Sequence, residues 1–207
     1  MRIIECNQGS PEWAAARLGI PTASQFHRII TAKTLKISES SNGYMCELLA
    51  ERLLGMPVLE PSVSGFMERG SALEQSAVAF YELQRGVDTE PVGFVLRDDG
   101  RVGCSPDRLV GADGGLEIKC PAAAQHVAHL LEMPLRFFPQ IQGCLWLTGR
   151  KWWDLLSYHP TMPPALVRID RDEEYIAALA AATETFLFRL ERGWELLERL
   201  GCVRAAA

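Results

Sequence analysis

Three charged residues in the segment CSPDRLVGADGGLEIKC have types and spacing that suit metal chemistry: Asp107, Glu117 and Lys119. Two carboxylates held close together repel each other unless a cation lies between them, and their hard oxygen atoms suit Mg²⁺ or Mn²⁺. Such an ion activates water and stabilises negative charge on a phosphoryl group, as hydrolysis of a phosphodiester requires. Lys119 would orient or deprotonate the water, or neutralise the phosphate.

Two strands must position these residues. Successive side chains of a strand point to opposite faces, so Glu117 and Lys119 share one face while the apolar residues around them share the other. If the GADGG turn is centred on Asp113, antiparallel pairing places Asp107 opposite Lys119 and Leu109 opposite Glu117. We therefore expect the three charged groups to meet in one pocket.

A simpler structure also explains these residues. A surface hairpin with an ordinary cross-strand ion pair, worth about 0.2 to 1 kcal/mol, would show the same residue types. The spacing D-x9-E-x-K is a loose pattern and leaves both interpretations open.

Glu74 is a further carboxylate candidate. It lies on a helix predicted for residues 71–84, at the edge of the apolar face that includes Leu73 and Tyr81. Ser71 and Glu74 also have the spacing of a capping box, in which the glutamate would serve the start of the helix. Capping and metal contact do not exclude each other.

The remaining pattern predicts an α/β fold with a mixed central sheet flanked by helices. Helices are expected at residues 11–18, 22–30, 44–54, 71–84, 122–133, 135–148 and 173–200. Strands are expected at residues 92–96, from 102, at 109–110, 116–120, 152–159 and 165–170. No internal repeat or low-complexity linker marks a boundary, so we expect one domain over residues 1–207.

Composition limits the class of protein. Hydrophobic residues make up 48% and charged residues 23% of the chain, which favours a folded protein over a disordered one. No apolar run reaches the roughly 18 residues that span a bilayer, and the opening residues lack a leader pattern, so we expect a cytosolic protein. The cysteines have no metal-ligand spacing and are expected to be reduced and mostly buried; they are Cys6, Cys46, Cys104, Cys120, Cys144 and Cys202.

The net charge of −5 argues against binding to nucleic acid, which usually requires a basic balance. However, the first forty residues are locally basic: they contain Arg2, Arg17, Arg28, Lys33 and Lys36 against Glu5, Glu12 and Glu39. A basic face on an acidic protein is compatible with this distribution.

Five stretches of the sequence are WAAARLGIPTAS, the helix start GSALE, CSPDRLVG, GLEIKCP and PQIQGCLWLTGRKWW. These stretches resemble the phage-type exonucleases related to lambda exonuclease, also called YqaJ-type viral recombinases, of the PD-(D/E)XK nuclease superfamily. They occur in the family's order and cover about three quarters of the chain. The resemblance implies a restriction-endonuclease-like core.

The resemblance also implies an activity. Such enzymes are processive, Mg²⁺-dependent exonucleases, with Mn²⁺ as an expected substitute. They degrade one strand of duplex DNA from 5'-phosphorylated ends in the 5'-to-3' direction and leave 3' single-stranded tails. They form homotrimeric rings around DNA and act with a single-strand annealing protein in recombination. The implied setting is the cytoplasm of a bacterial cell, with a phage or prophage as the source.

Site residues follow from the same resemblance, position by position. It implies metal binding for Asp107, Glu117 and the carbonyl of Ile118, and catalysis for Lys119, Glu117, Asp107, Gln140 and Glu74. It implies a pocket for the 5'-phosphate formed by Arg17, Ser24 and Ser105. An arginine fork and two hydroxyls suit a terminal phosphate. Alternatively, Ser24 caps or back-bonds within its helix and Arg17 lies on a solvated face.

Other residues permit a functional and a structural interpretation. Phe66 or Met67 would be the apolar wedge that separates the terminal base pair, or would simply be packed. His126 and His129 have zinc-ligand spacing but no further ligands nearby, so a partly exposed helix surface is expected. Trp152 or Trp153 would stack on bases or enter the core.

Two rival functions remain. A related endonuclease or nickase would have no use for a pocket that binds a terminal phosphate. A non-catalytic DNA-binding module of the same fold would not depend on Asp107.

Overall fold

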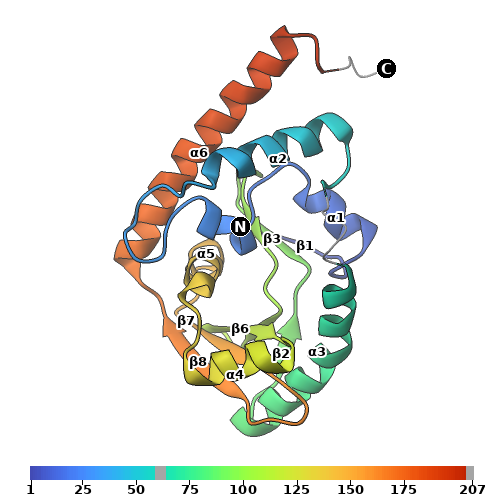
Figure 1. Cartoon of the computed structure of the whole chain (residues 1–207), viewed down its shortest axis with the longest axis vertical. Coiled ribbons are helices and arrows are strands. Elements are labelled where there is room, and N and C mark those ends of the chain that lie inside the picture. Colours follow the sequence, from blue (N-terminus) through green and yellow to red (C-terminus); the bar gives the residue numbers. More distant parts are fainter. Residues whose placement is uncertain (59–63, 204–207) are drawn as a thin grey trace.

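In the computed structural model, helices surround two β-sheets (Figure 1). The structure describes residues 1–58 and 64–203, apart from the side chains of residues 64–72. The α-helices are α1 (Pro11–Arg17), α2 (Ser41–Leu54), α3 (Ser64–Arg85), α4 (Ala123–Leu131), α5 (Phe138–Thr148) and α6 (Glu173–Arg199). Two 3₁₀ helices are η1 (Ala23–Arg28) and η3 (Leu135–Phe137). The strands are β1 (Arg2–Ile4), β2 (Thr89–Pro91), β3 (Phe94–Leu96), β4 (Gly103–Cys104), β5 (Arg108–Val110), β6 (Gly114–Lys119), β7 (Trp152–Ser157) and β8 (Ala165–Asp170).

The larger sheet has the strand order β2-β5-β6-β7-β8 and is mixed. Its β6–β7 pair is parallel, and its other neighbours are antiparallel. Parallel neighbours need a long crossover connection, which here consists of α4, η3 and α5. The smaller sheet, β1-β3-β4, is antiparallel. The predicted α/β class with a mixed sheet flanked by helices is confirmed.

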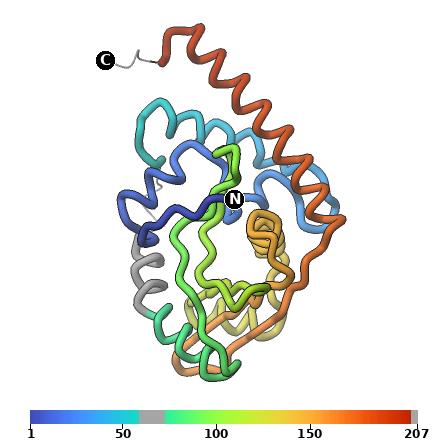
Figure 2. The backbone as a smooth tube through the Cα atoms, turned by 180° about the vertical axis from the view of Figure 1, so that it is seen from behind, coloured from blue at the N-terminus to red at the C-terminus, as the bar shows by residue number. Residues whose placement is uncertain are grey.

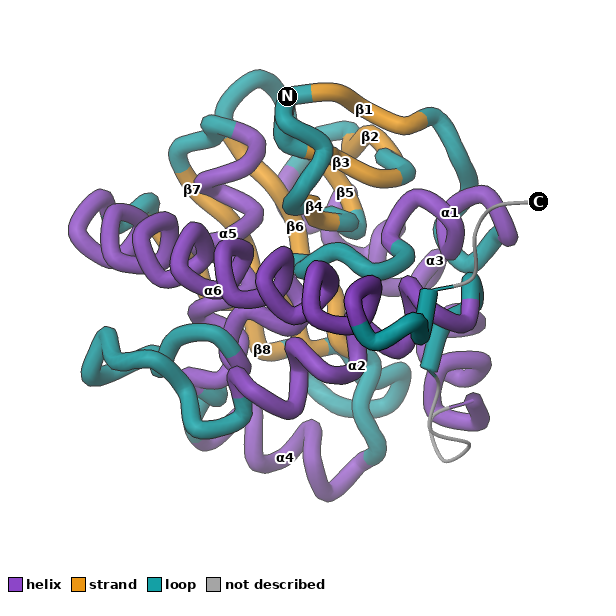
Figure 3. The backbone as a smooth tube through the Cα atoms, turned by 90° about the horizontal axis from the view of Figure 1, so that it is seen from above, coloured by secondary structure: helices purple, strands orange, loops and turns teal. Residues whose placement is uncertain are grey.

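The two faces of β6 serve different purposes. Leu116 and Ile118 are buried against Tyr81 of α3 in one apolar cluster. The main core lies elsewhere and is formed largely by α2, α5, η1 and α6, and Figure 3 shows how α6 passes over this part of the molecule. Glu117 and Lys119 alternate with the apolar residues and so point away from α3. The predicted alternation of β6 is confirmed.

Local signals placed several helix ends correctly. Ser10 Oγ accepts a hydrogen bond from the Trp13 N–H at the start of α1. Gly55 and Gly149 follow α2 and α5 in the left-handed conformation, at φ of 67° and 71°. By contrast, α3 begins at Ser64, well before the predicted start at residue 71. Ser71 therefore lies inside the helix, and the capping-box role considered for Glu74 is wrong because a cap must stand at a helix end.

The predicted register of the central hairpin was wrong. Leu109 pairs with Gly115, not with Glu117, and Arg108 pairs with Leu116. The turn occupies residues 111–113, because Gly114 and Gly115 belong to β6, where they pair with Trp152 and Trp153 of β7. Continuing this register by one residue places Asp107 opposite Glu117 instead of Lys119.

Gly115 allows this pairing because its missing side chain leaves room for an indole ring. A Cβ atom at residue 115 would lie 2.4 Å from ring atoms of Trp153, which is 0% exposed. We expect Gly115→Ala to lower the free energy of unfolding by about 3 kcal/mol, measured by urea denaturation.

In the matched control Gly43→Ala, on the exposed side of α2, the new Cβ meets only Arg28 Nη2 at 3.7 Å. That change should be neutral or stabilise by up to about 1 kcal/mol, and equal effects of both substitutions would contradict this account.

Two further expectations can be compared with the structure. None of the described helices combines the length and apolarity that crossing a membrane requires. The six cysteines are free, but the expectation that most are buried was wrong. Cys104 and Cys144 are buried, whereas Cys46 and Cys202 are exposed.

Candidate active site

The carboxylate of Glu117 is the centre of a polar cluster beneath α5. It lies on β6 and is 2% exposed. Its Oε1 atom accepts hydrogen bonds from Lys119 Nζ and from Gln140 Nε2, each at 2.6 Å. Its Oε2 atom is also buried and has no hydrogen-bond partner among the described residues. A buried carboxylate oxygen of this kind requires a cation or a donor to offset the loss of water.

Asp107 precedes β5 and reaches across to the backbone of β6. Its Oδ2 atom accepts a hydrogen bond of 2.5 Å from the Ile118 N–H. The N–H and C=O of one strand residue point to the same edge of the strand, so the Ile118 carbonyl also faces the edge where Asp107 lies. Burial, and next the charge of Glu117, raise the pKa of Asp107 well above its ordinary value.

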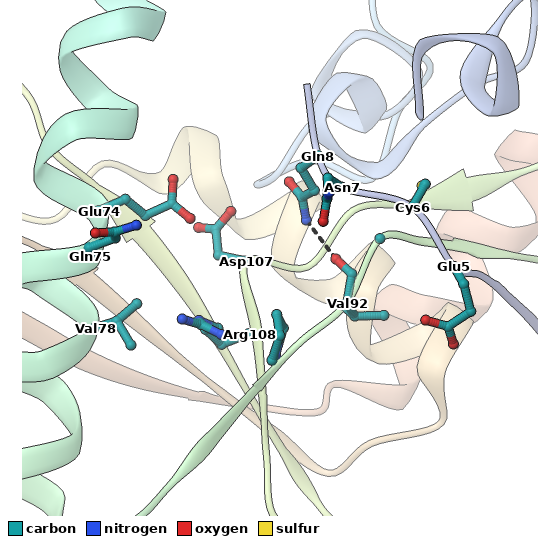
Figure 4. A pocket seen from close by; sticks show the side chains of 12 residues that line it. Glu5, Cys6, Asn7, Gln8, Glu74, Gln75, Val78, Val92, Asp107 and Arg108 are labelled. Carbon is teal, nitrogen blue, oxygen red and sulfur yellow. Dashed lines mark hydrogen bonds between the residues drawn. The ribbon is translucent and has the colours of Figure 1, made fainter. Parts of the chain in front are cut away.

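Glu74 of α3 approaches the cluster from the side of a cavity. Figure 4 shows the carboxylates of Glu74 and Asp107 pointing toward one another. Both line a cavity of about 680 Å³ whose other walls include Gln8 and Arg108. Burial raises the pKa of Glu74, and the charge of Arg108 partly offsets this effect.

Lys119 balances part of this negative charge. Burial by itself lowers the pKa of Lys119, but the charges of Glu117 and Asp107 outweigh it, so the pKa is raised above its ordinary value. Lys119 therefore carries a full positive charge at neutral pH. Its Nζ atom also lies 5.3 Å from the ring centroid of Phe137, at the end of η3.

The donor set fits a hard divalent cation. Asp107, Glu117 and the Ile118 carbonyl supply oxygen atoms, which Mg²⁺ prefers, and the unpaired Oε2 of Glu117 marks where positive charge is missing. Within the described part of the chain, no three His, Cys, Asp or Glu side chains form a metal site by themselves. For an ion at this position, the Ile118 carbonyl together with water or a substrate phosphate would have to complete the coordination.

The three residues of the expected phosphate pocket lie on neighbouring segments. Arg17 ends α1, and its guanidinium stacks over the Trp13 ring at 3.9 Å. Trp13 Nε1 donates a hydrogen bond of 2.9 Å to Ser105 Oγ. Thr22 forms a parallel β-bridge with Gly103, so Ser24 and Ser105 each follow that bridge by two residues.

The alternatives for the two N-terminal residues are less well supported. Arg17 is half-buried, not on a fully solvated face. The hydroxyl of Ser24 contacts Thr22 Oγ1 at 3.3 Å, and Thr22 occupies the N-cap position of η1. Ser24 therefore has no capping role.

Sequence reasoning missed two residues that organise this region. Trp13 joins Arg17 to Ser105, and the i, i+4 spacing of Trp13 and Arg17 on α1 was a signal that could have found it. Gln8 Nε2 donates hydrogen bonds to the carbonyls of Val92 and Pro106, at 3.0 and 2.7 Å, next to Asp107. Gln8 and Pro106 are 98 residues apart in the chain, and no local pattern indicates their contact.

Other expectations fall outside the cluster. The side chains of Phe66 and Met67, the expected wedge, lie outside the described residues. The expectation that His126 and His129 form a partly exposed surface was wrong, because they are 0% and 3% exposed. Trp153 is fully buried in the core, so it is not accessible to a base.

The chain matches one family model and several solved structures. A family model described as the YqaJ-like viral recombinase domain matches residues 12–151. No curated protein sequence gives a significant match. Among solved structures, an alkaline exonuclease from Laribacter hongkongensis, solved alone and in complex with dAMP, is 34% identical, with a TM-score of 0.83. That match covers 93% of this chain and 98% of the other.

A second structure extends the similarity of the fold. A phage-related exonuclease from Haemophilus somnus is 16% identical, with a TM-score of 0.69 over 87% of this chain and 96% of the other. At this identity the match supports the fold alone.

Proposed function

Because the chain belongs to the YqaJ-like viral recombinase domain family, we propose that it is a Mg²⁺-dependent exonuclease that degrades one strand of duplex DNA in the 5'-to-3' direction. The observation that carries this proposal is the geometry around Glu117. A buried carboxylate is held by Lys119 and Gln140 through one oxygen, and its other oxygen lacks a partner. The similarity to an exonuclease at 34% identity supports the same reaction class.

Each residue has a chemical role in this proposal. Asp107, Glu117 and the Ile118 carbonyl hold the ion, which when bound supplies a Lewis acid and lowers the pKa of bound water. Lys119 is charged and close to Glu117, so it neutralises the scissile phosphate or orients the attacking water. The alternative role of Lys119 is removal of a proton from the attacking water.

The amide of Gln140 and the carboxyl group of Glu74 support this centre. Gln140 Nε2 fixes the orientation of the Glu117 carboxylate through Oε1 and leaves Oε2 directed elsewhere. Glu74 has a raised pKa and lies beside Asp107 at the cavity wall. A carboxyl group with these properties is suited to accept a hydrogen bond from water and to pass a proton onward.

The pocket of Arg17, Ser24 and Ser105 is proposed to bind the 5'-phosphate. A terminal phosphate carries more negative charge than an internal one, and the planar guanidinium of Arg17 can engage two of its oxygens. Stacking on Trp13 limits the directions in which the guanidinium points. Binding at this pocket would direct the enzyme to DNA ends.

The decisive experiment compares three substrates with Mg²⁺ and with EDTA: a linear duplex with 5'-phosphate ends, the same duplex with 5'-hydroxyl ends, and a closed circle. We expect Mg²⁺-dependent release of mononucleotides from the 5' ends of the phosphorylated duplex and much slower release from the hydroxylated one. Rapid cleavage of the circle would instead establish the rival endonuclease or nickase, and no cleavage under any condition would support the non-catalytic module.

Arg17→Ala tests the end-binding pocket. Loss of a charged hydrogen-bonding group should lower kcat/KM on 5'-phosphorylated ends by roughly 10- to 100-fold, with little change on 5'-hydroxyl ends. The control is Arg28→Ala, because Arg28 is a nearby arginine whose guanidinium is paired with Glu47 at 2.6 Å. A loss of equal size on both kinds of end would show that Arg17 does not read the phosphate.

The proposal extends to assembly and partners. A homotrimeric ring around DNA would reconcile the net charge of −5 with DNA binding, since only the lining of the channel must be basic. The 3' single-stranded tails would serve a single-strand annealing protein in recombination. Sedimentation of the protein with and without duplex DNA tests the ring.

A further inference from the structure

Two buried histidines of α4 share one serine hydroxyl at the end of β7. The Nδ1 atoms of His126 and His129 each lie 2.9 Å from Ser157 Oγ. The Nε2 atom of His126 lies 2.8 Å from the carbonyl oxygen of Pro163. Both rings and the serine are almost fully buried, at 0%, 3% and 0% exposure. None of these groups has a role in the proposed reaction.

The partners fix which atoms carry the protons. A backbone carbonyl only accepts, so His126 Nε2–H is the donor to Pro163. The Ser157 hydroxyl has a single proton and can donate it to only one of the two Nδ1 atoms, so the other Nδ1 atom must donate to the serine. With its proton on Nε2, the His126 ring accepts the Ser157 hydroxyl at Nδ1. Ser157 Oγ in turn accepts from His129 Nδ1–H.

His129 completes this directed chain. Burial, and next the charges of Arg136, His126 and Lys119, lower the pKa of His129. A neutral His129 has a single N–H, which Ser157 uses, and its Nε2 atom is buried with no partner among the described residues. The hydrogen bonds therefore run in one direction from His129 through Ser157 and His126 to Pro163.

Two sets of contacts connect these residues to Lys119. Ser157 is the parallel-strand neighbour of Lys119, and the next N–H, of Tyr158, donates a hydrogen bond of 2.8 Å to the Lys119 carbonyl. The ring of His129 also meets Phe137 edge to face, with centroids 5.7 Å apart. The ammonium group of Lys119 lies over that same Phe137 ring.

We propose that His129, Ser157 and His126 are positioning residues that hold Lys119 next to Glu117. The hydrogen bonds fix α4 to the last residue of β7, and β7 and Phe137 in turn constrain the backbone and the side chain of Lys119. This inference rests on the proposed function, which gives Lys119 its place at the scissile phosphate. Displacing a reacting group by about 1 Å is enough to lower a reaction rate substantially.

Ser157→Ala is the first test, because it deletes both central hydrogen bonds and alters neither ring. We expect the single-turnover rate to fall by roughly tenfold, with the dissociation constant for duplex DNA unchanged. In a Lys119→Ala background the same substitution should cause no further loss, because its effect passes through the lysine. An equal loss in both backgrounds, or no loss in either, overturns the proposal.

His159→Asn is the matched control. The His159 ring lies 5.6 Å from that of His126, but its Nδ1 atom contacts Thr161 and not Ser157. This variant should keep the wild-type rate. A tenfold lower rate for His159→Asn would show that any disturbance of this region slows the reaction. The specific role of the hydrogen bonds among His129, Ser157 and His126 would then be rejected.

A measurement on the wild-type protein keeps the idea testable if Ser157→Ala fails to fold. Nitrogen-15 NMR of the imidazoles should show His126 with its proton on Nε2 and His129 with its proton on Nδ1. The same tautomer for both rings would break the directed chain. If Lys119→Ala proves as active as wild type, the proposed active site fails, whereas the tautomers are unaffected, so the two failures are distinguishable.

Discussion

Asp107→Asn is expected to lower the single-turnover rate of DNA hydrolysis by roughly a thousandfold or more. Asparagine keeps the size of the side chain and can still accept the hydrogen bond from the Ile118 N–H. It removes a negatively charged oxygen, which Mg²⁺ binding requires. Isothermal titration should accordingly show weaker Mg²⁺ binding. An Asp107→Asn variant with wild-type activity would exclude Asp107 as a metal ligand and contradict the proposed site.

The stability of Asp107→Asn distinguishes loss of a metal ligand from misfolding as the cause of inactivity. The pKa of Asp107 is raised by burial and then by Glu117, so its ionised form is disfavoured in the metal-free fold. The protonated carboxyl group of Asp107 therefore contributes to the stability of the fold at low pH. This contribution is lost as the pH rises through the raised pKa. Near pH 7 the neutral asparagine should therefore keep or increase the Tm of the metal-free protein. A lower Tm would mean that the inactive variant is damaged and not merely deprived of a ligand.

Asp113→Asn is the control for this prediction. Asp113 lies in the turn that joins β5 to β6, and it pairs with Lys151 on the surface at 3.0 Å. The side chain of Asp113 is 51% exposed in this pair. The variant should retain the wild-type rate and the wild-type requirement for Mg²⁺.

Lys119→Ala should have the second-largest effect, lowering the rate by roughly 100- to 1000-fold because charge on the phosphate is no longer neutralised. It should also destabilise the metal-free protein. Glu117 is almost fully buried, and removing its cationic partner leaves an uncompensated charge, which typically costs about 3 kcal/mol. Urea denaturation without metal measures this loss.

Mg²⁺ should reverse part of that loss. If the ion binds at Glu117, its addition should raise the Tm of Lys119→Ala more than that of the wild type, because the variant has the larger unbalanced charge. Lys151→Ala is the control, since Lys151 is 72% exposed in its pair with Asp113 and should affect neither rate nor Tm. Equal Mg²⁺ responses in Lys119→Ala and the wild type would argue that the ion binds elsewhere.

The sequence predicted the features of the site that depend on local alternation and residue type. Glu117 and Lys119 share a face of β6 because strand geometry leaves no other arrangement once the apolar neighbours are buried. The register of β6 was not predictable in the same way. It depends on Trp152 and Trp153, which occupy the space above Gly114 and Gly115 and come from a strand far along the chain.

The same limit explains the other errors. Residues 64–70 read SGFMERG and contain two glycines, which are poor helix formers, so the helix was predicted to begin only at residue 71, whereas α3 begins at Ser64. His126 and His129 of α4 were predicted to be surface residues because their partner, Ser157, follows about thirty residues later, on β7. Trp13 and Gln8 were missed because they act through contacts with Ser105 and Pro106, which folding brings from a distant part of the sequence.

The parallel pairing of β6 with β7 limits where the protein can be truncated. The match to the family model stops at Lys151, one residue before β7 begins, although every residue assigned to metal binding or catalysis lies inside it. A fragment cut at that boundary would have all the reactive groups but an uncovered strand edge beside Glu117, which favours aggregation over folding. Chimeras and truncated expression designs should therefore keep β7, β8 and α6, which form the orange-to-red part of the chain in Figure 2, together with the reactive centre.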